Sequence, residues 1–300
     1  MNALKGFFPR ITINILCLGI VAMTVATSNA ESRLYQAAMH EAEWLIHSSV
    51  FECKLSQPIP QYGEAHFYHR AGEPLQFQML ASSDLLADVD VSLKSVPPPW
   101  NSRRSEKNLG HVSLSENSSS MVLETIFARK LMNEMLTGMV PMFEGTSNFD
   151  QQLAVHVAVS PLHFQSAYSA YQKCSGGLLP VNYDQVQRST IFWKSNMRQL
   201  DNESMELLDN IVLYSEADSS IVGFEVDSFT DTVGERRDNL LISEERAFAV
   251  TNYLVSKGVD PEAIATRAHG EREEYLMANP EKTLADRNRN RRVNIVMVRR

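Results

Sequence analysis

The sequence predicts an α+β protein with two domains: a strand-rich amino-terminal domain, antiparallel and barrel-like with some helices, and a carboxy-terminal mixed β-sheet with helices on it. The chain has 300 residues, which is more than one hydrophobic core usually holds. Alternating hydrophobic runs dominate its first half, whereas helical periodicity and short strand-like runs take turns in the second. With 44% hydrophobic and 21% charged residues, the composition is that of a globular protein.

Residues 1–30 form a predicted export signal that precedes both domains. Lys5 and Arg10 supply a basic start, residues 11–26 are mainly apolar, and small residues lead to a cleavage site after Ala30. The apolar run is shorter than the roughly 20 residues that cross a bilayer, although a retained membrane anchor is the alternative. We therefore expect a mature chain in the periplasm, without a membrane span.

Two cysteines, Cys53 and Cys174, stay in the chain after this cleavage, whereas Cys17 leaves with the signal. Cysteines in an oxidising compartment tend to form disulfides, so we expect these two to pair. Closing a loop of about 120 residues stabilises a fold by about 2–4 kcal/mol, mostly by restricting the unfolded chain. Two separate buried thiols are the alternative.

The first domain is predicted over residues 31–180 and begins with alternating strands. Two alternating runs flank a turn at residues 70–74 and predict a hairpin. A helix is expected over residues 121–137, which lack Pro and Gly, and another after Ser160 and Pro161, with Cys174 at its end. The polar stretch 101–120 is predicted to be a loop.

The second domain is predicted over residues 185–300, after a Gly- and Pro-containing boundary at residues 176–185. Its strands and helices follow the order strand, helix, strand, helix, strand, strand, which implies a small mixed sheet covered by helices. The predicted elements are a strand at 191–193, a helix capped by Asp201 or Asn202, a strand at 221–226, a long helix at 235–257 and strands at 264–268 and 293–298.

Arg246 lies inside the apolar face of that long helix. It follows Ile242 by four positions and precedes Val250 by four, so its side chain starts from the packed side. Burying a charge without a partner is costly. We therefore expect a carboxylate or a negatively charged ligand beside Arg246.

Asn239 lies two helical turns before Arg246, and the loop before the helix carries Thr230 and Asp231. These four residues can form a pocket with an acceptor for an ammonium group and a forked donor for a carboxylate. Such a pocket suits a zwitterion. The spacing equally allows an internal ion pair between Asp231 and Arg246 that only ties the loop to the helix.

The region around these residues contains an ordered series of motifs: Thr230-Asp231, Gly234, Asn239, Ile242-Ser243, Arg246-Ala247, Tyr253-Leu254, Gly258, Gly270-Glu271, Asn279, Arg287 and Asn290-Arg291-Arg292-Val293. In this series the region resembles the OmpA-type peptidoglycan-binding domain over about 110 residues. The resemblance implies an OmpA-like fold in which Asp231 and Arg246 hold the ammonium and carboxylate of diaminopimelate in the peptidoglycan stem peptide. It also implies that Asn239 and Thr230 position this group and that Arg291 lines the same site.

A set of short motifs runs through the amino-terminal half: Phe51-Glu52-Cys53-Lys54-Leu55, Ile59-Pro60, Gly63, Ala65, Phe67, Ala71-Gly72, Pro141-Met142-Phe143, Tyr171-Gln172-Lys173-Cys174 and Gln185-Val186. In these motifs the chain resembles the MotY family of sodium-driven flagellar motor proteins. That resemblance implies a component of the periplasmic T ring, with the flagellar basal body ring and the stator proteins as partners. A general envelope protein that links peptidoglycan to a non-flagellar complex is the alternative.

Other classes of function find little support in the sequence. It has no His-Glu-x-x-His spacing, no Gly-x-Ser-x-Gly elbow and no phosphate-binding glycine loop, so we expect no enzyme, cofactor or metal site. Six arginines lie within residues 287–300, which suggests a nucleic-acid binder. The net charge of −8 and the export signal argue against that function, and we expect no nucleic-acid partner.

Overall fold

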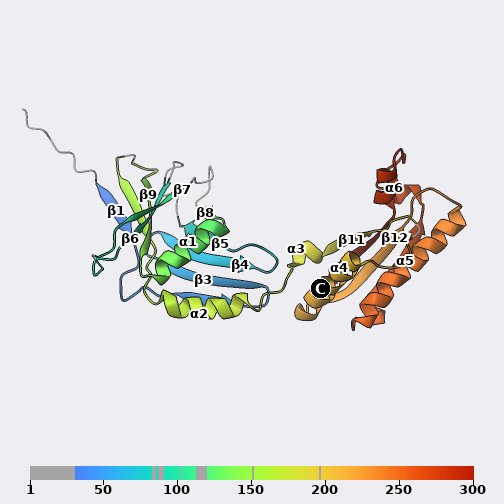
Figure 1. The fold of residues 1–300 in the computed structure, drawn as a ribbon, viewed down its shortest axis with the longest axis horizontal. Coiled ribbons are helices and arrows are strands. Elements are labelled where there is room, and N and C mark those ends of the chain that lie inside the picture. Colours follow the sequence, from blue (N-terminus) through green and yellow to red (C-terminus); the bar gives the residue numbers. More distant parts are fainter. Residues whose placement is uncertain are drawn as a thin grey trace, which may run out of the picture.

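The computed structural model describes residues 31–82, 86, 91–101, 103–112, 120–150, 152–195 and 197–300. The predicted export signal lies outside these ranges. Figure 1 shows a strand-rich amino-terminal part and a carboxy-terminal part with long helices, joined by a short connection. Within the described ranges, no helix combines the length and the apolar character that crossing a membrane requires.

The amino-terminal strands form two five-stranded sheets. Among the described strands, no pairing closes these sheets into one barrel, so the barrel-like expectation was wrong. The antiparallel expectation holds except where β1 pairs with β10 in parallel. The first sheet has the order β1 (Ser32–Tyr35), β10 (Ala154–Ala158), β9 (Val140–Thr146), β6 (Val91–Val96) and β7 (Lys107–Val112); the second has the order β2 (Leu45–Ser48), β3 (Glu52–Ile59), β4 (Gly63–Arg70), β5 (Gln76–Ala81) and β8 (Ser120–Leu123).

One aromatic core joins the two sheets. The predicted hairpin is present as β4 and β5, which place Phe67 opposite Phe77. The ring centroids of Phe67 and Phe77 lie 5.1 Å apart, and Phe77 stacks on Phe143 of the other sheet at 5.7 Å. All three rings are fully buried. Because Phe143 comes from β9, its burial fixes the two sheets against each other.

Three local predictions in this part need correction. The predicted helix over residues 121–137 starts later, as α1 (Thr125–Leu136), because the first residues pair with β5 as strand β8. Helix α2 (Phe164–Ser175) begins after His163, which takes a left-handed conformation, and not at Pro161. The predicted loop 101–120 contains β7, whose pairing with β6 outweighs its polar composition.

A disulfide joins Cys53 on β3 to Cys174 on α2, as expected, with a Cα–Cα distance of 6.0 Å and a sequence separation of 121. We expect no free thiol in denatured, unreduced mature protein. Replacing both cysteines by serine is expected to lower the free energy of unfolding by about 2–4 kcal/mol, because the unfolded chain gains freedom. Urea unfolding of the variant beside the oxidised parent measures this loss. Two titratable thiols in the parent, or equal stability, would contradict the pairing.

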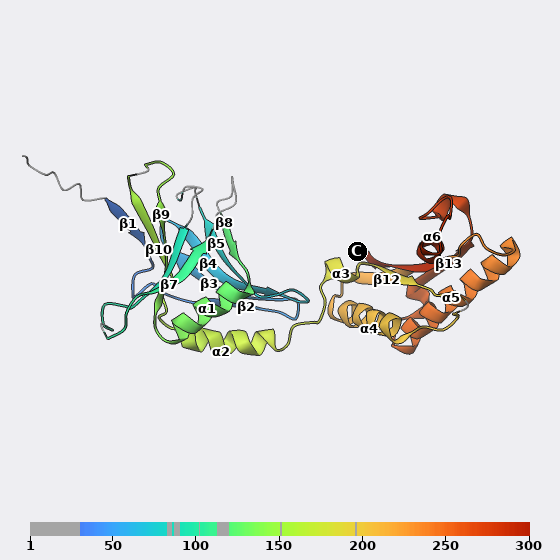
Figure 2. The same cartoon turned by 45° about the horizontal axis from the view of Figure 1, so that its top comes forward.

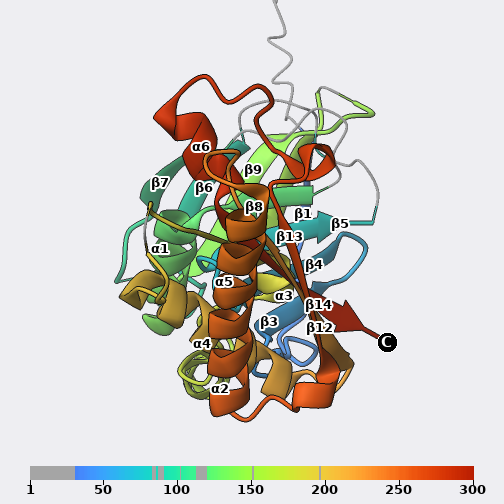
Figure 3. The ribbon, with the colours of Figure 1, turned by 90° about the vertical axis from the view of Figure 1, so that its right-hand side faces the viewer.

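The carboxy-terminal part is a mixed four-stranded sheet covered by helices, as predicted. Strand β12 pairs in parallel with β13, and the other pairs are antiparallel. Figure 3 shows the long helix α5 running along this sheet. The elements are α3 (Tyr183–Val186), β11 (Arg188–Phe192), α4 (Asn202–Ala217), β12 (Ile221–Phe229), α5 (Arg236–Ser256), β13 (Ile264–Gly270), α6 (Leu284–Asn290) and β14 (Arg292–Arg299), and the sheet order is β11-β14-β12-β13.

The connection between the two parts is held by specific contacts. The Arg70 Nη2 and Asp184 Oδ2 atoms lie 2.6 Å apart, and the Gln185 side-chain amide donates to the Gly72 carbonyl at 3.1 Å. The ring of Phe51, from the amino-terminal part, packs against the hydrophobic cluster of the carboxy-terminal part. Figure 2 shows the resulting elongated arrangement, with β1 near one end and α6 near the other.

Candidate ligand-binding site

The five residues predicted to form a site come together at one end of the carboxy-terminal sheet. Thr230 and Asp231 directly follow β12, Asn239 and Arg246 belong to α5, and Arg291 directly precedes β14. All five are buried. Because β12 and β14 are paired neighbours, the end of one strand and the start of the other lie side by side. The sheet therefore places both arginines close to the acidic loop.

Arg246 is a buried cation without an ion-pair partner among the described residues. Its side chain lies on the packed face of α5, as predicted, and is only 3% exposed. Neither Nε nor Nη1 has a hydrogen-bond partner there. The pKa of the Arg246 guanidinium is lowered to about 10, mainly by burial and also by the charge of Arg291, while Asp231 opposes the shift. An anionic group that accepted hydrogen bonds from Arg246 would relieve this cost.

The carboxylate of Asp231 forms its ion pair with Arg291 and not with Arg246. Arg291 also donates through Nε to the carbonyl of Trp193 at 3.2 Å and through Nη2 to the side chain of Asn288. The internal Asp231–Arg246 pair that the sequence allowed is therefore absent from the described ion pairs. Among the five predicted site residues, two buried guanidinium groups therefore stand beside one carboxylate.

Thr230 and Asn239 hold different places in this site. The Thr230 hydroxyl is buried without a hydrogen-bond partner among the described residues. Its backbone N–H donates to the Gly270 carbonyl at 2.9 Å, which fixes the loop. The Asn239 amide donates to the Val233 carbonyl at 3.2 Å and to the side chain of Glu271. Thr230 is thus free to bind a ligand, whereas Asn239 holds the loop around it.

Trp193 is a residue of the site that the sequence did not reveal. The Arg246 guanidinium carbon lies 5.4 Å from the centroid of the Trp193 ring, within range of a cation–π interaction. The indole N–H of Trp193 is also buried without a hydrogen-bond partner in the described part of the chain. The only sequence signal was a tryptophan at the end of the strand predicted at residues 191–193. The unpaired donors of Trp193, Thr230 and Arg246 all favour a ligand rich in acceptor oxygens.

The class of the carboxy-terminal part follows from its sequence, because residues 192–291 match the family model of the OmpA family. This span contains all five predicted site residues. Outer membrane protein A of Bordetella avium is 34% identical over 122 residues, which are 40% of this chain and 59% of that protein. Outer membrane protein A of Serratia marcescens is 34% identical over 88 residues, only 24% of its length.

Residues 35–180 match the family model of the MotY N-terminal domain. The chain therefore consists of a MotY N-terminal domain followed by an OmpA family domain. The sodium-type flagellar protein MotY of Vibrio parahaemolyticus is 25% identical over 241 residues, which are 79% of this chain and 82% of that protein. These relatives are a flagellar protein and outer membrane proteins by name, and none of the names is that of an enzyme.

Solved structures also match part of the chain. The peptidoglycan-associated lipoprotein from Burkholderia pseudomallei is 22% identical with a TM-score of 0.33, and covers 36% of this chain and 89% of its own. The C-terminal domain of Helicobacter pylori MotB is 20% identical with a TM-score of 0.34, and covers 37% of this chain and 85% of its own.

Proposed function

We propose that this protein is a periplasmic T-ring component of a sodium-driven flagellar motor that anchors the basal body and stator units to the cell wall by binding peptidoglycan non-covalently. One observation carries the wall-binding part: Arg246 is buried with two guanidinium nitrogens unpaired among the described residues. Natural proteins rarely leave such a charge unpaired unless a ligand completes it.

Diaminopimelate in the stem peptide has the chemistry that this site lacks. The free end of its side chain carries a carboxylate and an ammonium group. The carboxylate accepts hydrogen bonds from Arg246, with the Thr230 hydroxyl and the Trp193 indole N–H as further donors. The ammonium binds the Asp231 carboxylate, which it shares with Arg291. The zwitterionic end is neutral overall, so it supplies acceptors to Arg246 and a cation to Asp231 without changing the net charge of the site.

In this proposal the remaining residues position the binding groups. Arg291 holds Asp231 in place, and its bond to the Trp193 carbonyl fixes the backbone of Trp193 beside the site. Asn239 ties the loop that follows Asp231 to Glu271. Changes at Asn239 or Arg291 therefore act on affinity through the geometry of Asp231 and the loop.

The MotY N-terminal domain and the likeness to a sodium-type flagellar protein support the motor part. The amino-terminal domain docks onto the basal body and recruits stator units, while the OmpA family domain holds the wall. Export with a cleaved signal delivers the chain to the periplasm. The force that opposes the motor torque then passes through the protein to the wall, without any chemical step.

Two measurements test this function. The purified mature protein should cosediment with sacculi at physiological salt and should not bind DNA at the same salt. Binding to DNA without cosedimentation would contradict wall binding and support a nucleic-acid partner. Deleting the gene should give cells whose flagellar filaments form but do not rotate. Normal swimming after deletion would remove the motor assignment and favour a general envelope linker.

A further inference from the structure

The amino-terminal domain has an apolar groove that no other described residue covers, which we call the Trp100 groove. Its cavity of about 500 Å³ lies between the end of β1, the segment after β6 and the residues that lead into α2. The side chains of Leu34, Met39 and Trp100 line it and are 55%, 64% and 58% exposed. Large apolar side chains that gather around one exposed cavity usually mark a binding surface.

Among the described residues, no charged side chain lines the groove. Two arginines, however, come soon after Trp100 in the sequence. Arg103 and Arg104 come after Trp100 in a turn that the Arg104 N–H closes on the Asn101 carbonyl at 3.3 Å. Neither guanidinium forms an ion pair with a described residue, although the charge of Arg104 acts on the Glu134 carboxylate, which pairs with Lys107. The charge beside the groove therefore favours a partner with acidic residues.

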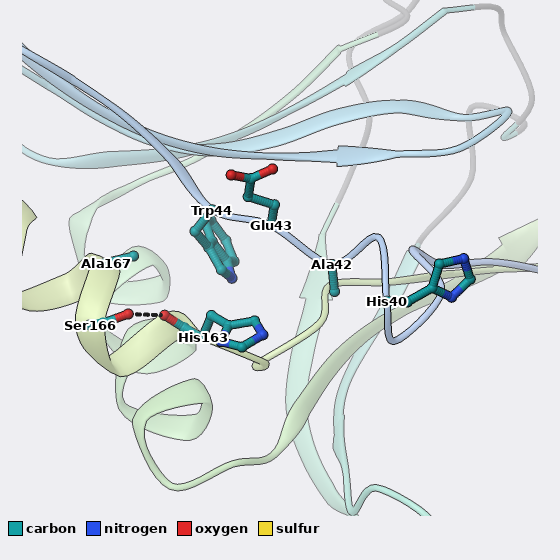
Figure 4. A pocket seen from close by; sticks show the side chains of 7 residues that line it. All are labelled: His40, Ala42, Glu43, Trp44, His163, Ser166 and Ala167. Atoms are coloured by element: carbon teal, nitrogen blue, oxygen red, sulfur yellow. Dashed lines mark hydrogen bonds between the residues drawn. The ribbon is translucent and has the colours of Figure 1, made fainter.

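The wall of the groove is preformed. The connection from β1 to β2 separates the groove from a neighbouring cavity of about 510 Å³, lined by Glu43, Trp44 and His163 among others (Figure 4). The indole N–H of Trp44 donates to the Ser160 carbonyl at 3.1 Å, and its ring packs edge-on against Phe164. Because Ser160 lines the groove, the bond from Trp44 holds that side of the groove in place before binding.

The position and charge of the groove decide between occupants. It lies at the end of the molecule away from α6 and the candidate peptidoglycan site, as Figures 1 and 2 show by the places of β1 and α6. A tether needs its second attachment at such a place. A second copy of this chain on the same surface would bring two Arg103-Arg104 pairs together across a two-fold axis, which like-charge repulsion opposes.

We propose that the Trp100 groove seats an apolar segment, flanked by acidic residues, of a protein of the flagellar basal body. This inference rests on the proposed function and names the surface through which the amino-terminal domain docks. The apolar side chains of the segment displace water from Leu34, Met39 and Trp100. Its acidic residues meet Arg103 and Arg104.

Copurification of the mature full-length protein with isolated basal bodies tests this surface. Leu34→Glu and Trp100→Ala should each weaken retention by about 30-fold or more, because a central aromatic anchor of an interface dominates its affinity. The double variant R103E/R104E should weaken it and remove its salt dependence. Ile126→Ala, which changes a 76% exposed side chain on α1, is the matched control and should be retained like the parent.

The outcomes separate the groove from the motor assignment. If the parent is retained and Leu34→Glu and Trp100→Ala are retained equally, the groove proposal is wrong and the motor function stands. Equal retention of R103E/R104E alone would overturn the acidic character of the partner. Absence of the parent itself from basal bodies would overturn the motor function and the groove together. All variants should still cosediment with sacculi, since the peptidoglycan site lies in the other domain.

Discussion

Arg246→Leu is expected to abolish cosedimentation with sacculi while the protein keeps its fold. Removing the buried charged partner of a ligand carboxylate typically weakens the free energy of binding by about 2–5 kcal/mol, which lowers the affinity roughly 30-fold or more. The variant should be at least as stable as the parent. Burial lowers the pKa of Arg246 to about 10, so the folded state bears a cost on the order of 3 kcal/mol at any pH below that value. Leucine removes this cost and leaves some empty volume.

A matched control for this variant is Arg198→Leu. Arg198 forms an exposed ion pair with Glu245, which lies next to Arg246 on α5, at 2.6 Å between Arg198 Nη1 and Glu245 Oε2. Loss of this exposed pair should change neither sacculus binding nor stability appreciably. Cosedimentation measures the binding and thermal unfolding measures the stability. Unchanged binding by Arg246→Leu would refute the site, and unfolding at a much lower temperature would show that Arg246 has an internal partner after all.

Asp231→Ala is expected to abolish binding and also to destabilise the carboxy-terminal domain, by about 3–5 kcal/mol. The reason is that Asp231 is the ion-pair partner of the buried Arg291. Without this carboxylate, Arg291 and Arg246 remain buried as two like charges. Urea unfolding of the full chain, followed by circular dichroism, measures the loss.

The double variant D231A/R291M separates the two effects of Asp231. Replacing Arg291 by methionine removes the unpaired charge, so the double variant should regain most of the stability that Asp231→Ala loses. It should not regain sacculus binding, because the acceptor for the ligand ammonium is still missing. A double variant that is no more stable than Asp231→Ala would argue against the Asp231–Arg291 pair.

The sequence predicted the burial of Arg246 because helical periodicity is a local property. Ile242 and Val250 flank Arg246 at four-residue spacing, and the same spacing of apolar residues predicted a helix over most of α5. Most of the order of strands and helices in the carboxy-terminal domain followed from similar local patterns, but helix α6 between β13 and β14 was not predicted. Family resemblance then suggested the ligand that we propose, which periodicity alone could not indicate.

The partner of Asp231 could not be read from local patterns. Arg291 reaches Asp231 only because β14 pairs with β12, and this pairing brings together residues that are 60 positions apart. Trp193 enters the site through another pairing, that of β11 with β14, which the backbone bond from the Trp193 N–H to the Arg291 carbonyl continues. The separation of the amino-terminal strands into two sheets is equally non-local, since alternating strands suit a barrel and a pair of sheets alike.

Titration of two stem peptides into the mature protein tests most directly whether Arg246 recognises the side-chain carboxylate of diaminopimelate. The peptides differ only in the third residue, which is diaminopimelate in one and lysine in the other, so that lysine lacks this carboxylate. Calorimetry should detect binding of the diaminopimelate peptide, weaker binding of the lysine peptide by about 30-fold or more, and no such difference for Arg246→Leu. Equal affinity of the parent for both peptides, or no binding of either, would contradict the account.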